Sequence, residues 1–164
     1  MPVAAIRSSA LPSSPTPRLR LTRELLLIDK SDGFCENYEE VWAPVIELSF
    51  AYGDVIVRRD ELVLQPIQRC PATERQARFL LESFGALELD CISGCEPPLT
   101  SRAEYVIDLD GDIDALCTFS AYALPQLRRL GWQIEVAKDY PIDVVDGDQP
   151  WFARVSPDDE RPDW

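Results

Sequence analysis

The sequence predicts a single α+β domain in which two principal helices pack on one face of a mainly antiparallel sheet. Three stretches carry this prediction: an alternating run over 46–52, a helical run over 72–84, and the run over 119–136. The last joins a helical apolar face, a glycine and an alternating strand. Alternation leaves one face of each strand polar, which favours antiparallel pairing. The length of 164 residues suits one domain.

The first 17 residues are rich in proline, serine and alanine and lack periodicity, so we interpret 1–17 as a flexible leader or linker. The folded domain is expected over 18–164. From Arg18, the run RLRLTRELLLID predicts a first strand. The following residues, 29–44, carry charges, a glycine and a proline, and we expect a loop there.

A hairpin is predicted next. Four apolar residues alternate with Glu47, Ser49 and Ala51; they are Ile46, Leu48, Phe50 and Tyr52. The pair Gly53-Asp54 has glycine at the first turn position, which favours a type II′ turn before a short return strand at 55–57. A further strand over 62–67 is expected to extend the hairpin to a meander.

The first helix is predicted near 72–84. Pro71 suits a helix start, and Thr73 with Gln76 forms a capping-box pattern. One face is apolar and consists of Ala77, Leu80, Leu81 and Phe84, after which Gly85 ends the helix.

Short strands are expected over 86–92 and 104–109, separated by a loop. The second helix is predicted over 112–130. Pro125 is expected to kink or restart it, because proline lacks the amide hydrogen and clashes with the preceding turn.

Gly131 is the expected left-handed cap of this helix. The strand that follows alternates Trp132, Ile134 and Val136 with polar residues. Four residues are predicted to lie in the core: Trp132, Leu127, Leu80 and Phe84. The run WFARV, Trp151 to Val155, is expected to form one more strand.

The composition excludes several chemistries. The chain has no histidine, which removes Ser-His and Cys-His catalysis and every histidine metal ligand. Its only lysines, Lys30 and Lys138, do not follow glycine, so there is no standard phosphate loop. We nominate no catalytic, cofactor-binding or metal-binding residue and expect no cofactor. A small hydrolase remains an alternative without a nominated nucleophile or base.

Two patterns resemble metal sites at first sight. Acidic residues surround Gly111, but an EF-hand loop would place its first ligand at Val106, which cannot serve. We interpret this run as a turn with Asp112 as helix N-cap. Cys91 and Cys95 lack the further ligands of a closed zinc site. The five cysteines are an odd number at irregular spacing, which favours reduced thiols in the cytoplasm.

The net charge of −13, from 16 basic and 29 acidic residues, disfavours direct binding of nucleic acid. No window approaches 18 uninterrupted apolar residues, so we expect no membrane partner.

From Arg18 onward, the order of elements resembles the N-terminal accessory region of large bacterial Swi/Snf-type ATPases, which are superfamily-two helicases. The similar pieces are LRLTREL, IELSFAYGD, TERQARFLLESFGAL, ALPQLRRLGWQIEVAKDY, and WFARV with DW at the end. The best motif is LP-x-L-x-x-x-GW. The phosphate-loop lysine and the acidic motif of the family lie in the motor, and neither maps onto this chain.

The resemblance implies that 18–164 is one non-catalytic accessory domain, a fragment of a larger cytoplasmic chain. Its partner would be the ATPase motor of the same polypeptide, which it would dock on or regulate, and nucleic acid would be bound only through that parent. Trp151, Phe152 and Trp164 are the candidate interface residues, and their exposure would give a weak homodimer of the isolated fragment. The alternative is a stand-alone acidic binding protein of the inhibitor or immunity type.

Overall fold

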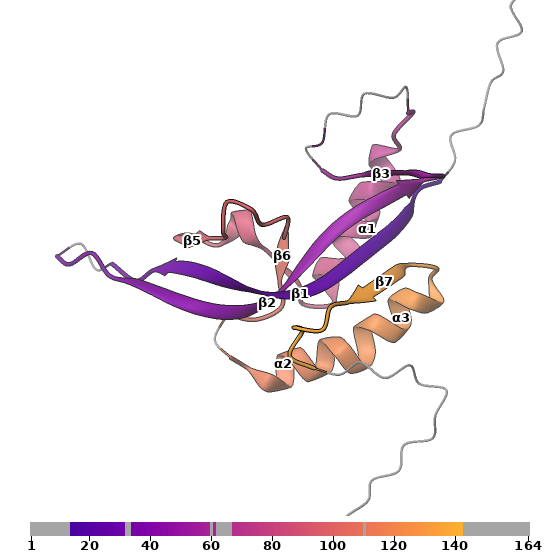
Figure 1. Cartoon of the computed structure of the whole chain (residues 1–164). Coiled ribbons are helices and arrows are strands. Elements are labelled where there is room, and N and C mark those ends of the chain that lie inside the picture. The colour runs from indigo at the N-terminus through magenta and orange to yellow at the C-terminus, as the bar shows by residue number, and fades with distance from the viewer. Residues whose placement is uncertain (1–13, 32–33, 60, 62–66, 110, 143–164) are drawn as a thin grey trace, which may run out of the picture.

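The computed structural model describes residues 14–31, 34–59, 61, 67–109 and 111–142, and Figure 1 shows their arrangement. The fold is α+β, as the sequence predicts. In chain order the elements are β1 (Thr16–Asp29), β2 (Tyr38–Tyr52), β3 (Val55–Val57), α1 (Pro71–Ser83), β4 (Leu87–Glu88), a 3-10 turn (Leu89–Cys91), β5 (Cys95–Glu96), β6 (Tyr105–Val106), α2 (Ile113–Thr118), a π-helical turn (Phe119–Ala123), α3 (Leu124–Arg129) and β7 (Gln133–Val136).

A long antiparallel ribbon of β1 and β2 is the centre of the sheet, with register from Thr16↔Ala51 to Asp29↔Tyr38. The strands β3 and β6 pair with β2, β4 pairs with β6, and β5 pairs with β1, all antiparallel. Only β7 pairs in parallel, against β1, among the described strands. The sheet is therefore mixed. The strands β6 and β7 run in the same direction on opposite sides of the β1–β2 pair, and the helical segment between them makes the crossover connection.

The ribbon buries opposite faces at its two ends. Next to β7, the residues that face the large core have odd numbers in β1 and even numbers in β2: Leu19, Leu21, Ile46, Leu48 and Phe50. In the other half, the buried residues have the opposite parity and face a small core: Leu26, Ile28, Ala43 and Val45. Successive side chains of a strand point to opposite faces, so this change of parity is a change of face.

Different segments cover the two halves. Both α1 and the α2–α3 segment contribute buried side chains to the large core, including Leu81, Leu116 and Leu127. The small core is closed instead by Leu89 and Val106. Figure 1 shows the helices beside the half of the ribbon that carries β3 and β7, while the other half projects away from them.

The expected loop over 29–44 is wrong for its second half, because β2 begins at Tyr38. Pro44 is tolerated inside β2 for a geometric reason. Its carbonyl accepts a hydrogen bond from the Ile107 amide, so even-numbered residues of β2 direct their backbone groups toward β6. The missing proline amide therefore costs no bond to β1. The strand β1 also begins earlier than expected, at Thr16.

The predicted first helix is confirmed as α1, but its N-cap is Cys70 without a side-chain cap bond, so the capping box predicted at Thr73 and Gln76 is wrong. The second helical region spans α2, the π-helical turn and α3, so the interruption expected at Pro125 takes the form of a π-helical turn just before it. Proline cannot donate to the carbonyl four residues earlier, and a wider turn accommodates that loss.

The cap at Gly131 is confirmed. Gly131 has a φ of 86°. Its amide donates to the Arg128 carbonyl at 2.9 Å, and the Trp132 amide donates to the Leu127 carbonyl at 3.0 Å. These two bonds are those of a Schellman motif. Trp132 and Leu127 are buried together in the large core, as predicted.

The other two predicted core residues, Leu80 and Phe84, are only partly buried and pack at the edge of the large core. Leu81 and Ala77 take the deeper positions on the same helix. The face of α1 that packs on the core is therefore rotated slightly from the predicted apolar face.

At the first hairpin, Gly53 has a φ of 62° and no non-glycine residue has positive φ among those described, which agrees with the type II′ turn. The expected strands over 86–92 and 104–109 are present but shorter, as β4 and β6. Most of the strand expected over 62–67, and all of that at 151–155, lie outside the described residues.

A buried polar network ties α1 to β2. Glu74 is 7 % exposed and accepts hydrogen bonds from the Tyr52 hydroxyl at 2.6 Å and from Arg69 at 2.6 and 3.0 Å. Burial alone raises the pKa of the Glu74 carboxyl, but the bonds from Arg69 and Tyr52 outweigh it and hold the pKa below its ordinary value. Burial raises the pKa of Tyr52 to about 12.

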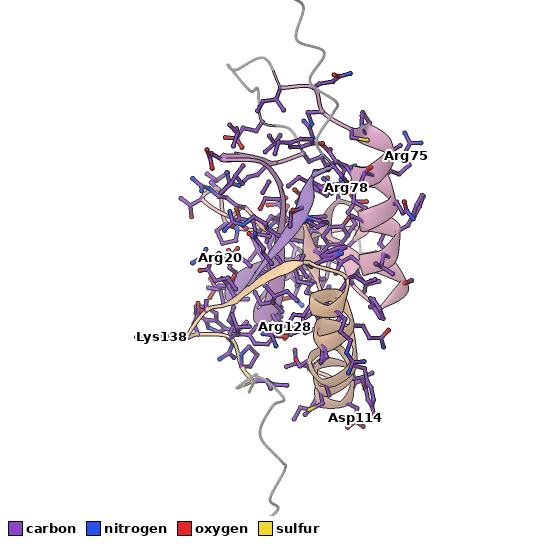
Figure 2. The ribbon with its side chains drawn as sticks, turned by 90° about the vertical axis from the view of Figure 1, so that its right-hand side faces the viewer. Arg20, Arg75, Arg78, Asp114, Arg128 and Lys138 are labelled. Carbon is purple, nitrogen blue, oxygen red and sulfur yellow. The ribbon has the colours of Figure 1, made fainter. Side chains whose placement is uncertain are left out.

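A second arginine of α1 joins the helix to the sheet. In Figure 2, Arg78 is directed from α1 toward the sheet, and Arg75 points away from it. The guanidinium of Arg78 binds Glu104 and lies 5.8 Å from the centre of the Phe50 ring. Charge and cation–π attraction thus reinforce the packing of α1.

We expect Trp132→Ala to lower the free energy of unfolding by about 3–5 kcal/mol, because it removes a large buried aromatic. Trp42→Ala is the control, since Trp42 is 57 % exposed, and it should cost under about 1 kcal/mol. Urea unfolding of both variants measures the difference. An equal cost for the two substitutions would contradict the core assignment.

We expect Glu74→Gln to lower the free energy of unfolding at neutral pH by about 1–3 kcal/mol. The folded-state pKa is depressed, so the contribution of the carboxylate is present above its unfolded pKa, about 4.3. It is lost as the pH falls through the folded pKa. Urea unfolding between pH 7 and 3 should show a weaker acid dependence in the variant. The exposed Glu36→Gln should leave the profile unchanged, and an unaltered profile in Glu74→Gln would refute the network's role.

Candidate protein-docking surface

Among the described residues, one face of the projecting half of the ribbon has no core against it. The small core covers the side that carries Leu26 and Ile28. The opposite side carries Leu25, Leu27, Tyr38, Glu40 and Trp42, which we call the Trp42 face. Leu25 is paired with Trp42, and Leu27 is paired with Glu40.

The sequence produces this face through four consecutive apolar residues, 25–28. In a strand, two of them must point to each side. The small core uses one pair, and the other pair, Leu25 and Leu27, stays half-buried on the Trp42 face. Such a run inside an alternating strand was the available sequence signal for this surface, and the sequence-based interpretation did not use it.

The Trp42 face includes a shallow hollow of about 280 Å³ next to β5. Its lining is apolar apart from two carboxylates and consists of Leu25, Leu26, Leu27, Glu40, Glu96, Pro97, Pro98 and Leu99. Leu99 is fully exposed, and Trp42 and Tyr38 are more than half exposed. Trp42 and Tyr38 lie on one short piece of the ribbon, and Leu99 lies in the segment after β5 that lines the same hollow as Leu25 and Leu27. This grouping differs from scattered single apolar residues.

The Arg23 guanidinium lies 5.5 Å from the centre of the Trp42 ring. This cation–π contact orients the indole without covering the rest of the face. The side chains that could bind a partner are thus an aromatic ring held by an arginine, two leucines and two carboxylates.

The other open surface is polar and lies beside β7, on the side of the ribbon away from the large core. Two adjoining hollows of about 270 and 280 Å³ share Arg20, Glu47 and Arg102. Their charged lining comprises four arginines and three glutamates: Arg18, Arg20, Arg58, Arg102, Glu24, Glu47 and Glu135. Because the charges nearly cancel, this surface lacks the positive excess that phosphate binding uses.

Ion pairs within the domain use several of these charges. Arg58 pairs with Glu47 at 2.6 Å, and Arg20 pairs with Glu135 at 3.3 Å. These pairs involve four of the seven charged residues of the polar surface, while the Glu24 Oε2 atom is buried there without a hydrogen-bond partner among the described residues.

The predicted interface residues Trp151, Phe152 and Trp164 lie outside the described residues. The interpretation of Asp112 as N-cap is confirmed, since its side chain accepts from the Asp114 and Ala115 amides. Within the described ranges, no three His, Cys, Asp or Glu residues form a group that could hold a metal ion. No helix there has the length and apolar composition to cross a membrane.

Cys70, Cys91, Cys95 and Cys117 are free thiols. Cys70 precedes α1, and its sulfur lies 3.1 Å from the Thr73 hydroxyl, which lowers the pKa of the thiol. Burial raises the pKa of the Cys95 thiol.

We expect iodoacetamide at pH 8 to alkylate Cys70 several-fold faster than Cys95, because the thiolate is the reacting form. Peptide mapping by mass spectrometry over time measures both rates. Thr73→Val, which removes only the hydroxyl, should slow the reaction at Cys70 and leave Cys95 unchanged. Equal rates at the two thiols in the unmodified chain would show that the prediction is wrong.

No protein-family model, curated protein or solved structure matches this chain. The resemblance noted above therefore rests on the motif residues alone.

Proposed function

We propose that this chain is a non-catalytic docking domain that binds a basic protein surface through the Trp42 face. The observation that carries the proposal is the apolar Trp42 face, which no described residue covers, on a projecting ribbon whose opposite side is packed. Exposed aromatic and aliphatic side chains grouped in this way are typical of protein-binding sites, and tryptophan is enriched among residues that dominate binding energy.

Charge supports a basic partner. Glu40 and Glu96 line the apolar hollow, and the chain carries a net charge of −13. Complementary charge accelerates encounter and selects the partner, while the apolar centre supplies most of the affinity. The same charge opposes direct binding to nucleic acid.

The resemblance to the accessory region of bacterial Swi/Snf-type ATPases names the partner. We propose that the domain docks on the ATPase motor of the same polypeptide in the cytoplasm and regulates it. A motor that binds nucleic acid offers the basic surface that the Trp42 face requires. Nucleic acid and ATP would then be handled by the motor, consistent with the missing phosphate loop and histidine of this chain.

The second candidate is a stand-alone acidic protein of the inhibitor or immunity type, which the net charge favours equally. The two differ in where the partner is encoded. The full reading frame of the gene separates them, because only an accessory domain is continuous with a motor.

We expect Trp42→Ala to weaken binding to the purified motor by about 30-fold or more, as for central aromatic residues of interfaces. Tyr122→Ala is the matched control, because Tyr122 is 67 % exposed on the helical side of the domain. This variant should bind the motor as tightly as the unmodified chain. Isothermal titration calorimetry measures both, and affinity should fall as salt rises.

Three results would count against the proposal: no binding to the motor, binding unaffected by Trp42→Ala, or equal losses in the two variants. Self-association through the Trp42 face is a further outcome that would replace the motor with a second copy. Sedimentation of the wild-type chain and Trp42→Ala over a concentration series detects it.

A further inference from the structure

The strand β1 has an interrupted outer edge. On the side away from β2, β7 pairs with Arg18–Leu21, and β5 pairs with Leu27–Ile28. Between these two, within the described part of the chain, no strand pairs with 22–26 on this side. The gap is five residues long, or about 17 Å of extended chain.

The backbone groups that face this gap follow from the hydrogen bonds on either side of it. The Leu21 carbonyl accepts from the Ala137 amide at 2.9 Å, and the Asp29 amide donates to the Gly94 carbonyl at 2.7 Å. Odd-numbered residues of β1 therefore direct their amides and carbonyls outward. By the same alternation, Arg23 and Leu25 present theirs to the gap.

The gap adjoins the apolar hollow. Leu25 lines the hollow, and its backbone belongs to the open edge. On the β5 side, the hollow continues over Glu96 and Leu99. A segment lying along the edge would thus meet backbone donors and acceptors, an apolar hollow and carboxylates at the same time.

We propose that the gap in β1 receives an extended segment of the partner, which adds a short strand between β7 and β5. This inference rests on the proposed docking function. The segment carries an apolar side chain that enters the hollow, and lysine or arginine side chains that meet Glu40 and Glu96. Strand addition of this kind gains affinity from backbone hydrogen bonds and specificity from alternate side chains.

An extended segment fits better than a helix. A helix satisfies its backbone groups internally and would leave the amides and carbonyls of Arg23 and Leu25 unused. An added strand pairs them. The charge of the segment follows from the two carboxylates that line the hollow and from the net charge of the chain.

The first test uses as probe a blocked pentapeptide with leucine and lysine at positions 2 and 4 and alanine elsewhere, which places both long side chains on the same face. The whole chain is labelled for NMR. We expect the peptide to slow exchange of the Arg23 and Leu25 amides. The Thr22 and Glu24 amides, which already face β2, serve as internal controls. A peptide of the same sequence with an N-methylated leucine keeps the side chains and should bind about tenfold more weakly. Equal binding of the two peptides, or unchanged exchange at Arg23 and Leu25, would overturn the proposal.

The second test changes the edge itself. Leu25→Pro removes an outward amide and no bond to β2, whereas Leu25→Ala removes only the side chain. Both should bind the peptide more weakly than wild type, and the proline variant should bind more weakly still. Equal affinities of the two variants would contradict strand addition. If the proline variant does not fold, the N-methylated peptide still decides the question.

Neither peptide test uses the motor. Loss of motor binding in Trp42→Ala without an effect of N-methylation would leave the docking function in place and remove strand addition. Peptide binding at the edge without motor binding would keep strand addition in place and exclude the motor as the partner.

Discussion

The period-two alternation of β1 and β2 is the constraint on which the rest of the structure depends. Each residue of a strand faces one side, so the apolar residues at 19 and 21 and those at 26 and 28 belong to opposite faces. One core cannot cover both. The helices cover the first half of the ribbon, and the segment that carries Leu89 and Val106 covers the other half from the opposite side. Two half-faces are left over, one polar and one apolar.

The two leftover half-faces have different consequences. On the polar one, Arg20 pairs with Glu135 and Arg58 pairs with Glu47, and exposed ion pairs of this kind meet water at little cost. The leucine and tryptophan side chains of the apolar half-face are not covered by any other described part of the domain. Their apolar area can leave water only against another surface. This asymmetry, rather than any single residue, directs the functional interpretation toward the projecting half of the ribbon.

The parts predicted correctly from the sequence are those with local signals. The helix α1 has Pro71 at its start, and the α3–β7 junction has Gly131, whose positive φ ends the helix. The start of β2 was missed because Pro44 and neighbouring charges indicate a loop. Pro44 is tolerated because its missing amide faces away from β1. Which neighbour a backbone amide faces depends on strand pairing, and the local sequence does not show it. The parallel pairing of β7 and the exposure of Trp42 depend likewise on which face each segment covers. The predicted terminal interface concerned residues outside those described.

The shape of the open edge argues for a short partner segment. Unpaired edges invite indefinite strand addition, and proteins blunt them with charges, prolines or covering segments. In β1 the gap contains no proline, and Arg23 and Glu24 are its only charged residues. It is bracketed instead, by β7 at Leu21 and by β5 at Leu27. Bracketing excludes a long strand or the flat edge of another sheet, yet leaves room for about five extended residues. The same two short strands that protect the ribbon from aggregation therefore define the length of the segment that it can accept.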